Sequence, residues 1–176
     1  MKTKLPITVP KQWLHIGHNR IEPQKFDTIR NIPLSNKPIG GLWASPLQLD
    51  THYRSEWHEF SVNVWGKMKH PYGTVFSIKK TARIFIIDSQ EDLINLFTEI
   101  GEAENPYVHL LPKDYLFLDF EKASQRYDVL FLSNKGQART RRPLYKEEYN
   151  LYGWDSECCL IMNPDVIQRQ LPIKLK

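Results

Sequence analysis

Apolar runs separated by turn residues predict a chain rich in β-strands. Short apolar and β-branched runs are typical of strands, and they occupy residues 12–17, 40–46, 74–78, 82–87, 127–133, 158–162 and 171–175. The run over residues 82–87 is apolar almost throughout, which predicts a strand in the centre of a sheet. The polar stretch over residues 22–38 is broken by prolines and predicts a loop.

Helical spacing appears in fewer segments. Over residues 51–65, large apolar side chains recur on one face: Tyr53, Trp57, Phe60 and Val64. We expect this aromatic stripe to pack in the core. A second helix is predicted between Ser89, a residue that caps helix N-termini, and Gly101, which suits a C-terminus. A short third helix is predicted over residues 117–124.

This succession of strands and helices predicts one α+β domain over residues 1–176. Neither a G-x-G-x-x-G sequence nor a P-loop occurs in the chain, so a doubly wound nucleotide-binding fold is not expected. With 176 residues, of which 41% are hydrophobic and 25% charged, the composition is that of a globular protein with its own core.

Charge and cysteine content bear on the expected partners and cellular compartment. The net charge of +4 permits an anionic partner without requiring one. Cys158 and Cys159 are the only cysteines and are adjacent, so they form no disulfide framework, and we expect a reducing cytoplasm. The N-terminus lacks the apolar run of a signal peptide, and no run is long enough to span a bilayer. We therefore expect no membrane partner.

The candidate chemistry lies near the end of the chain. The stretch WDSECCLIMN over residues 154–163 places Glu157 at the start of a buried strand. A carboxylate held there by a sheet is preorganised for electrostatic catalysis. Asp155 lies two residues earlier. Two other interpretations stay open: Glu157 is a solvated acid at a strand end, and Asp155 caps the turn after Gly153.

Three short stretches resemble, in this order, the motifs of the ADP-ribosyltransferase superfamily, which includes bacterial toxins and the poly-ADP-ribose polymerases. They are residues 13–18, 40–45 and 155–157, and the resemblance spans residues 13–167. It implies an α+β fold with an ADP-ribosyltransferase-like core of two packed β-sheets and flanking helices. It also implies an enzyme that cleaves the nicotinamide–ribose bond of NAD⁺ and transfers ADP-ribose to a macromolecule.

The resemblance assigns roles to individual residues. Glu157 would be the catalytic acid, because a carboxylate beneath the ribose stabilises the cation formed when nicotinamide leaves. The implied NAD-binding residues are His15, Gly41, Trp43, Ser45 and Tyr53. His18 is the alternative to His15 as the family's histidine. Trp43 or Tyr53 would stack on the nicotinamide ring.

The basic stretch over residues 135–146 lies where the family carries its acceptor-recognising loop. Arginines beside tyrosines suit phosphates and bases of a single strand, so we favour nucleic acid, RNA or DNA, slightly over protein as the acceptor. The implied acceptor-binding residues are Arg139, Arg141, Arg142, Tyr152 and Asp155. The setting implied is an intracellular toxin or phage-defence effector, with an antitoxin or other inhibitor protein as a possible partner.

Other functions are also compatible with these residues. A non-catalytic nucleic-acid-binding module would use the same basic stretch and leave the acidic motif structural. A carboxylate-dependent hydrolase using Glu157 and Asp155 ranks third, because acids two apart on one strand lie too close to activate water between them. The histidines include no convincing ligand set, so no metal site is expected. His15 and His18 would need helical spacing to converge.

Overall fold

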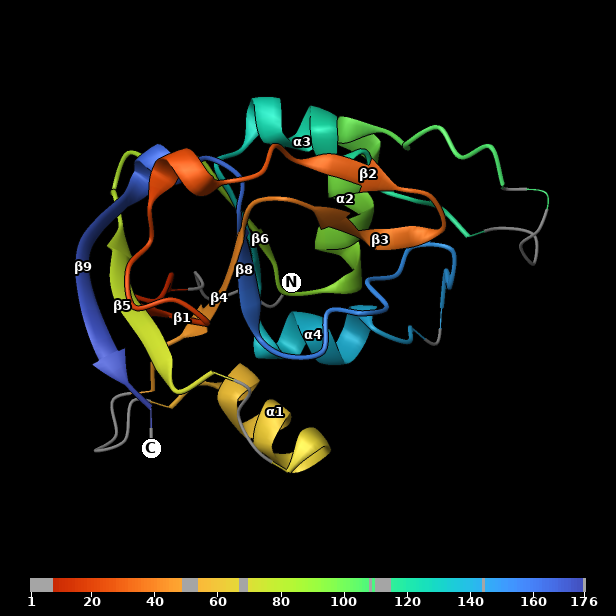
Figure 1. Cartoon of the computed structure of the whole chain (residues 1–176). Coiled ribbons are helices and arrows are strands. Elements are labelled where there is room, and N and C mark those ends of the chain that lie inside the picture. Colours follow the sequence, from red (N-terminus) through yellow and green to blue (C-terminus); the bar gives the residue numbers. More distant parts are fainter. Residues whose placement is uncertain are drawn as a thin grey trace.

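The computed structural model describes residues 8–48, 54–66, 70–107, 109, 115–143 and 145–175. Within these ranges the chain forms a seven-stranded mixed sheet, a two-stranded ribbon and four α-helices (Figure 1). The predicted α+β class is confirmed. None of the helices in this part of the chain has the length and apolar character needed to cross a membrane.

The seven strands follow a spatial order that differs from their order in sequence. That spatial order is β6 (Ile84–Ile87), β7 (Val129–Leu132), β8 (Cys158–Ile161), β4 (Leu42–Pro46), β1 (Trp13–Ile16), β5 (Tyr72–Ile78) and β9 (Ile167–Lys174). The ribbon pairs β2 (Arg30–Ile32) with β3 (Ser35–Ile39). The α-helices are α1 (Glu56–Trp65), α2 (Gln90–Ile100), α3 (Phe120–Arg126) and α4 (Asn134–Thr140), and 3-10 turns lie at Pro23–Lys25 and Pro164–Val166. Neighbours in the large sheet are antiparallel except β6 and β7.

The large sheet is continuous in its hydrogen bonding and folds over at β4. Residues 42–44 of β4 pair with β8, whereas residues 45–46 pair with β1 (Figure 1). Trp13 of β1 packs edge-to-face on Phe131 of β7, with ring centroids 5.1 Å apart, although the two strands are three positions apart in the sheet. The two halves therefore enclose a shared core. Two packed sheets were expected, and the two packed halves belong to one hydrogen-bonded sheet.

Helices α2 and α3 cover the opposite face of the β6–β7–β8 half. Ser89 caps α2 by accepting a hydrogen bond from the Asp92 N–H, and Gly101 ends the helix, as the sequence predicts. Five apolar side chains of α2 are buried: Leu93, Ile94, Leu96, Phe97 and Ile100. Each contributes about 2 kcal/mol through burial. This packing covers the half of the sheet in which β7 leads into α4.

The ribbon corrects the prediction of a loop over residues 22–38. Its strands do not alternate apolar and polar residues. Side-chain hydrogen bonds hold the ribbon against the body of the protein in place of a buried apolar face. Asn36 is buried; its Nδ2 donates to the carbonyls of Leu116 and Asn150, and its Oδ1 accepts from the Leu118 N–H. A pattern search for apolar periodicity does not detect strands held in this way.

The position of β6 corrects the prediction of a central strand over residues 82–87. β6 lies at an edge of the sheet. Its side chains are nevertheless covered on both faces, since Phe85 and Ile87 pack under the helices while Ile84 and Ile86 pack in the shared core. A continuous apolar run therefore indicates that both faces of a strand are covered. It does not indicate that the strand has a neighbour on each side in the sheet.

Helix α1 corrects the prediction of a core aromatic stripe. The helix begins at Glu56, with Ser55 as its N-cap, and ends at Trp65, with Gly66 as its C-cap. Trp57 and Phe60 are half-buried and Val64 is exposed. The rings of Trp57, Phe60 and Trp65 pack on one another. Tyr53, the first member of the predicted stripe, lies outside the described residues.

Candidate functional site

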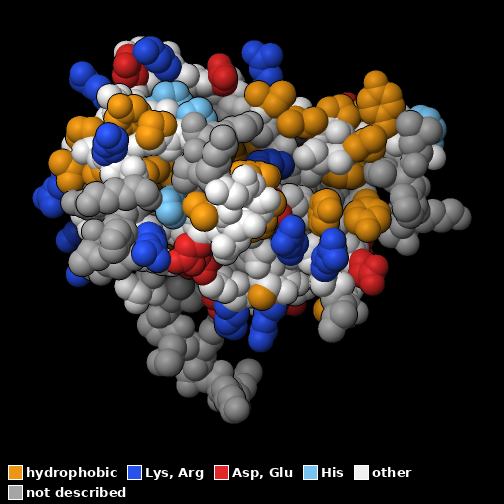
Figure 2. All heavy atoms as spheres, turned by 60° about the horizontal axis from the view of Figure 1, so that its bottom comes forward, with side chains coloured by type: hydrophobic (Ala, Val, Ile, Leu, Met, Phe, Trp, Pro, Cys, Tyr) orange, Lys and Arg blue, Asp and Glu red, His pale blue; other side chains and the backbone are white. Residues whose placement is uncertain are grey.

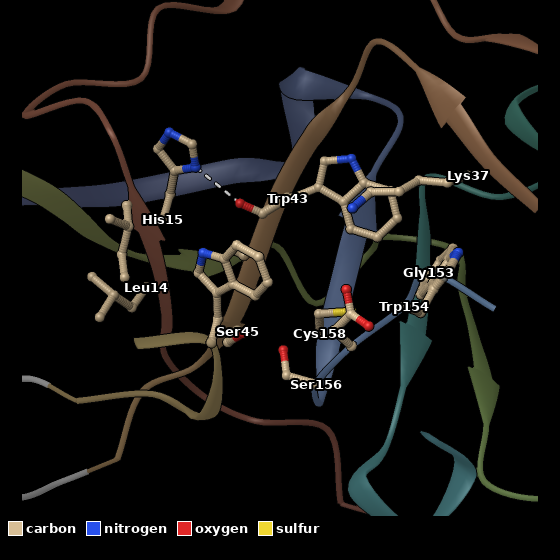
Figure 3. Close-up of a pocket in the computed structure, with 13 residues that line it drawn as sticks. Leu14, His15, Lys37, Trp43, Ser45, Gly153, Trp154, Ser156 and Cys158 are labelled. Atoms are coloured by element: carbon tan, nitrogen blue, oxygen red, sulfur yellow. Dashed lines mark hydrogen bonds between the residues drawn. The ribbon is translucent and has the colours of Figure 1, made fainter. Parts of the chain in front are cut away.

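A cavity opens beside β4, where its two neighbouring strands separate from it. The β1–β4 pairing ends at Leu14 and Ser45, and the β4–β8 pairing ends at Ala44 and Cys159. Beyond these pairs the strands diverge, and a cavity of about 200 Å³ lies between them (Figure 3). Side chains from β1, β3, β4 and α1 line it, together with the segment that leads into β8. The divergence of the sheet itself therefore creates the site.

His15 lies at this cavity and bridges the gap between β1 and β4. Its Nδ1–H donates to the main-chain carbonyl of Trp43 at 2.9 Å (Figure 3). Burial lowers the pKa of His15 below its ordinary value; the bond to Trp43 opposes this shift, and the charges of His18 and His70 add to it. The imidazole is therefore neutral near pH 7, with Nδ1 protonated and Nε2 as the acceptor.

His15 and His18 converge, contrary to the expectation from their predicted strand. β1 ends at Ile16, and Gly17 adopts a φ of +130°, which side chains other than glycine rarely allow. The chain turns there, so that His15 Nε2 lies 3.0 Å from His18 Nδ1 and the two rings stack. Within the described ranges, no group of three His, Cys, Asp or Glu side chains is placed to hold a metal ion.

Three tryptophans give the cavity an aromatic wall. Trp43 and Trp154 meet edge-to-face with centroids 4.6 Å apart, and Trp57 comes from α1. Trp154 is held in place because its Nε1–H donates to the Asn36 carbonyl at 2.7 Å. The ammonium of Lys37 lies 5.0 Å from the centroid of the Trp43 ring, a distance at which cation and ring attract. Such walls suit a planar, polarisable ligand.

Ser45 presents an unsatisfied hydroxyl to the cavity. Its residue surface is 1% exposed, and its Oγ is buried without a hydrogen-bond partner. A buried polar group left unpaired costs about 1–3 kcal/mol. Such a group in a native fold calls for an explanation, and a ligand that donates or accepts a hydrogen bond here would supply one.

Asp155 and Arg141 form an ion pair at the rim. Arg141 Nη2 lies 2.6 Å from Asp155 Oδ1, so Asp155 binds the basic stretch and does not serve only as a cap for the turn after Gly153. Arg141 also lines a second, larger groove of about 760 Å³. The cavity and the groove share Lys37 and Gly153, so the two hollows adjoin.

The groove carries part of the predicted acceptor site. Arg141, Arg142 and Tyr152 all line it, and the Arg142 guanidinium carbon lies 5.7 Å from the centroid of the Tyr152 ring. Arg141 Nε is buried without a hydrogen-bond partner. Arg139 is exposed and lines neither the cavity nor the groove.

The basic stretch differs from its prediction as a loop. Its first part is helix α4, capped by Ser133, whose Oγ accepts from the Gly136 N–H. Lys135 forms an ion pair with Asp88 at 2.6 Å. Two cations of the stretch, Lys135 and Arg141, are therefore neutralised within the fold.

Glu157 directly precedes β8, as predicted, and lies beside the cavity without lining it. Its neighbours Ser156 and Cys158 face the cavity. The Glu157 carboxylate turns toward α4, where Oε1 accepts from the Asn134 N–H at 3.3 Å. Burial raises the pKa of Glu157; the Asn134 N–H opposes this shift, and the charge of Glu56 adds to it. The carboxylate is thus easier to protonate than an ordinary glutamate.

The remaining predicted residues have different surroundings. Gly41 does not line the cavity, and its role is in the main chain: its φ is +66°, and a Cβ there would lie 2.8 Å from the Ile161 carbonyl oxygen. Only glycine suits that combination. Tyr53 lies outside the described residues, so its predicted stacking role stays a prediction.

Neither cysteine is suited to nucleophilic catalysis. Both are buried, and burial raises the pKa of each thiol far above its ordinary value. The thiols therefore stay protonated, whereas the thiolate is the nucleophile. Cys158 contributes an apolar surface to the cavity.

Sequence reasoning missed several residues of the site. Lys37 and Trp154 line the cavity, and Glu56 contacts the Glu157 main chain. Trp154 directly precedes the acidic motif at residues 155–157, and this position could have identified it as a site residue. Lys37 and Glu56 come from segments whose sequences give no hint of chemistry.

Comparison with protein-family models, with curated proteins and with solved structures found no significant match to this chain. Its function therefore has to be inferred from the geometry of the cavity and of the residues around it.

Proposed function

We propose that the protein is an NAD-dependent mono-ADP-ribosyltransferase. The observation that carries the proposal is the convergence of three stretches that lie far apart in sequence. His15 from β1, Ser45 from β4 and the segment before β8 surround one cavity, and they belong to the three motifs that suggested this chemistry. Each motif is only a few residues long, so their meeting in space is the stronger support.

The size and lining of the cavity fit nicotinamide. A cavity of about 150 Å³ accommodates benzene in another protein, so about 200 Å³ holds one substituted ring and excludes a whole dinucleotide. The tryptophan wall can stack on the nicotinamide ring, and the Lys37 ammonium beside Trp43 opposes its attraction for the positive charge of that ring. Ser45 Oγ offers a hydrogen bond to the carboxamide or the ribose, while the Trp43 carbonyl and His18 hold the His15 ring at the cavity. The ribose then lies outside the cavity, on the side of Glu157.

Glu157 stabilises charge at the ribose in this mechanism. The bond between ribose C1′ and the nicotinamide nitrogen breaks, its electron pair leaves with neutral nicotinamide, and a cation develops on the sugar. An ionised Glu157 stabilises that cation. A nucleophile of the acceptor then attacks C1′ and loses its proton. The main chain of β8 holds Glu157 in place.

The groove next to the cavity is the proposed acceptor site, and we favour nucleic acid as the acceptor. Arg142 with Tyr152 offers a cation and an aromatic ring to a phosphate and a base. Figure 2 shows Lys and Arg side chains spread among hydrophobic and acidic ones on the displayed face, without one continuous basic patch. The Arg142–Tyr152 pair supports a contact at the groove, and a protein acceptor is the second possibility.

One experiment tests the enzyme proposal. Purified protein is incubated with NAD⁺ labelled in the ADP-ribose part, together with RNA, DNA and protein fractions. We expect nicotinamide release and label in the nucleic-acid fraction. The isosteric variant Glu157→Gln should lower nicotinamide release at least about 100-fold, because it removes the charge and keeps the acceptor of the Asn134 N–H.

The matched control is Glu91→Gln, an exposed glutamate in the first turn of α2, which should leave the rate unchanged. Thermal unfolding of both variants should resemble that of the wild type. Absence of nicotinamide release with every fraction would refute the proposal and would favour the non-catalytic binding module. A toxin or defence role further predicts slower growth of cells that express the wild type than of cells that express Glu157→Gln.

A further inference from the structure

Two carboxylates from distant segments meet at Asn134. Glu56 is the first residue of α1 and lies 101 positions before Glu157. Glu56 Oε2 accepts from the Glu157 main-chain N–H at 2.9 Å, and its Oε1 accepts from the Asn134 side-chain amide. The Asn134 main-chain N–H in turn donates to Glu157 Oε1. Asn134 therefore joins the two acids.

The two acids, as far as the structure describes the chain, are not held by basic side chains, as the acids of ordinary structural ion pairs are. In the described part of the chain, neither Glu56 nor Glu157 is within ion-pair distance of a Lys or Arg side chain. Among the residues that the structure describes, the hydrogen bonds to the two carboxylates come from neutral donors. Two like charges close together oppose folding, and groups of this kind gather at functional sites.

Asp155, the other acid of the acidic motif, does not take the place of Glu56 beside Glu157. Asp155 forms an ion pair with Arg141 at the cavity rim, and no hydrogen bond joins it to Glu157 among the described residues. Glu56 instead contacts the main chain of Glu157 itself. Its helical neighbour Trp57 lines the cavity, so α1 links the acid pair to the ligand site.

We propose that Glu56 is the positioning residue for Glu157, holding the main chain before β8 so that the Glu157 carboxylate stands beside the cavity. The inference rests on the proposed catalytic role of Glu157. Glu56 does not touch the substrate in this scheme. It fixes the start of β8 to α1 and, through Asn134, to α4.

Removal of the Glu56 charge has two separable effects. Gln retains one acceptor oxygen, so either the Glu157 N–H or the Asn134 amide loses its partner and the carboxylate is less well placed. The negative charge of Glu56 also disfavours ionisation of Glu157; α4 contributes the Asn134 N–H, which favours it. Without the Glu56 charge the pKa of Glu157 falls, and ionised Glu157 persists to lower pH.

The test is the pH profile of nicotinamide release by Glu56→Gln, with Glu59→Gln as the matched control. Glu59 is an exposed glutamate on the same helix. We expect kcat of Glu56→Gln to fall about 10- to 100-fold, KM for NAD⁺ to change less than about twofold, and the acidic limb to move to lower pH. Glu59→Gln should match the wild type in all three quantities.

A second measurement does not depend on catalysis. Carbon-13 NMR of the side-chain carboxyls should show Glu157 titrating at lower pH in Glu56→Gln than in the wild type. An unchanged kcat and unchanged acidic limb would overturn the inference while leaving the enzyme proposal intact. A loss of activity that merely follows a lower melting temperature, with the NMR titration unmoved, would show a structural role. If the wild type releases no nicotinamide, both proposals fail together.

Discussion

Ser45 has surroundings that stability alone does not explain. A buried hydroxyl without a partner destabilises a fold, whereas an alanine in its place removes the unpaired group and leaves only a small space. Its position at the point where β4 parts from β8 puts it within reach of any ring in the cavity. Selection for binding would explain a serine at this position.

We therefore predict that Ser45→Ala keeps or raises the melting temperature and weakens NAD⁺ binding about 10-fold, the loss of about one hydrogen bond. KM from the nicotinamide-release assay and thermal unfolding measure the two effects. Ser77→Ala on β5, which is two positions from β4 in the sheet, is the control, because Ser77 lies outside the cavity. A lower melting temperature with unchanged KM would mean that the hydroxyl has a structural partner.

For single residues, short local motifs located part of the site, whereas contacts between residues far apart in sequence could not be predicted. His15, Trp43 and Ser45 were identified from runs of six residues, and the structure places all three at one cavity. Glu56 could not be found in that way, because its contact with Glu157 depends on how α1 lies against the start of β8. No spacing in the sequence encodes such a contact.

Among the elements, the junction of β6, β7 and β8 depends on one carboxylate. Asp128 lies just before β7 and accepts hydrogen bonds from the Arg83 main chain and guanidinium, and from the Asn163 side-chain amide. Hydrogen bonding by Arg83 is the main cause that lowers the pKa of Asp128, from 3.8 to about 2. A depressed folded-state pKa of an acid stabilises the fold above the unfolded-state pKa.

We predict that Asp128→Asn lowers the free energy of unfolding at pH 7 by about 1–2 kcal/mol, a value reduced for solvent screening because Arg83 is half exposed. The difference from the wild type should shrink as pH falls below about 4 and vanish only below pH 2, where Asp128 is protonated in the folded state as well. Urea unfolding at pH 7 and pH 3 measures this. Asp165→Asn, an exposed control, should show no such dependence.

The elements that were predicted well are those whose stability comes from burial of a periodic face. Helix α2 has its cap, its apolar stripe and its terminal glycine in the expected places. The β2–β3 ribbon was missed because Asn36 holds it through buried amide hydrogen bonds. Helix α1 shows the converse, since the periodic stripe was recognised while its rings pack on one another and stay partly exposed.

For the whole molecule, the sequence specified the strands of the large sheet but not how they pair within it. Apolar runs located β1, β4 and β8, whereas the change of partner within β4 depends on register, which a pattern of apolar residues does not encode. That change of partner folds the sheet and opens the cavity. The α+β class was therefore predictable, and the site volume was not.

The tryptophan wall has a spectroscopic consequence. Three of the five tryptophans, Trp43, Trp57 and Trp154, line the cavity, while Trp13 is fully buried and Trp65 is 55% exposed. An aromatic ligand that enters the cavity should change the intrinsic fluorescence of the protein, and Trp43→Phe should reduce that change. A nicotinamide titration that leaves the emission unaltered would argue against ring binding there. The protein thus carries its own optical reporter of occupancy, and no label is required.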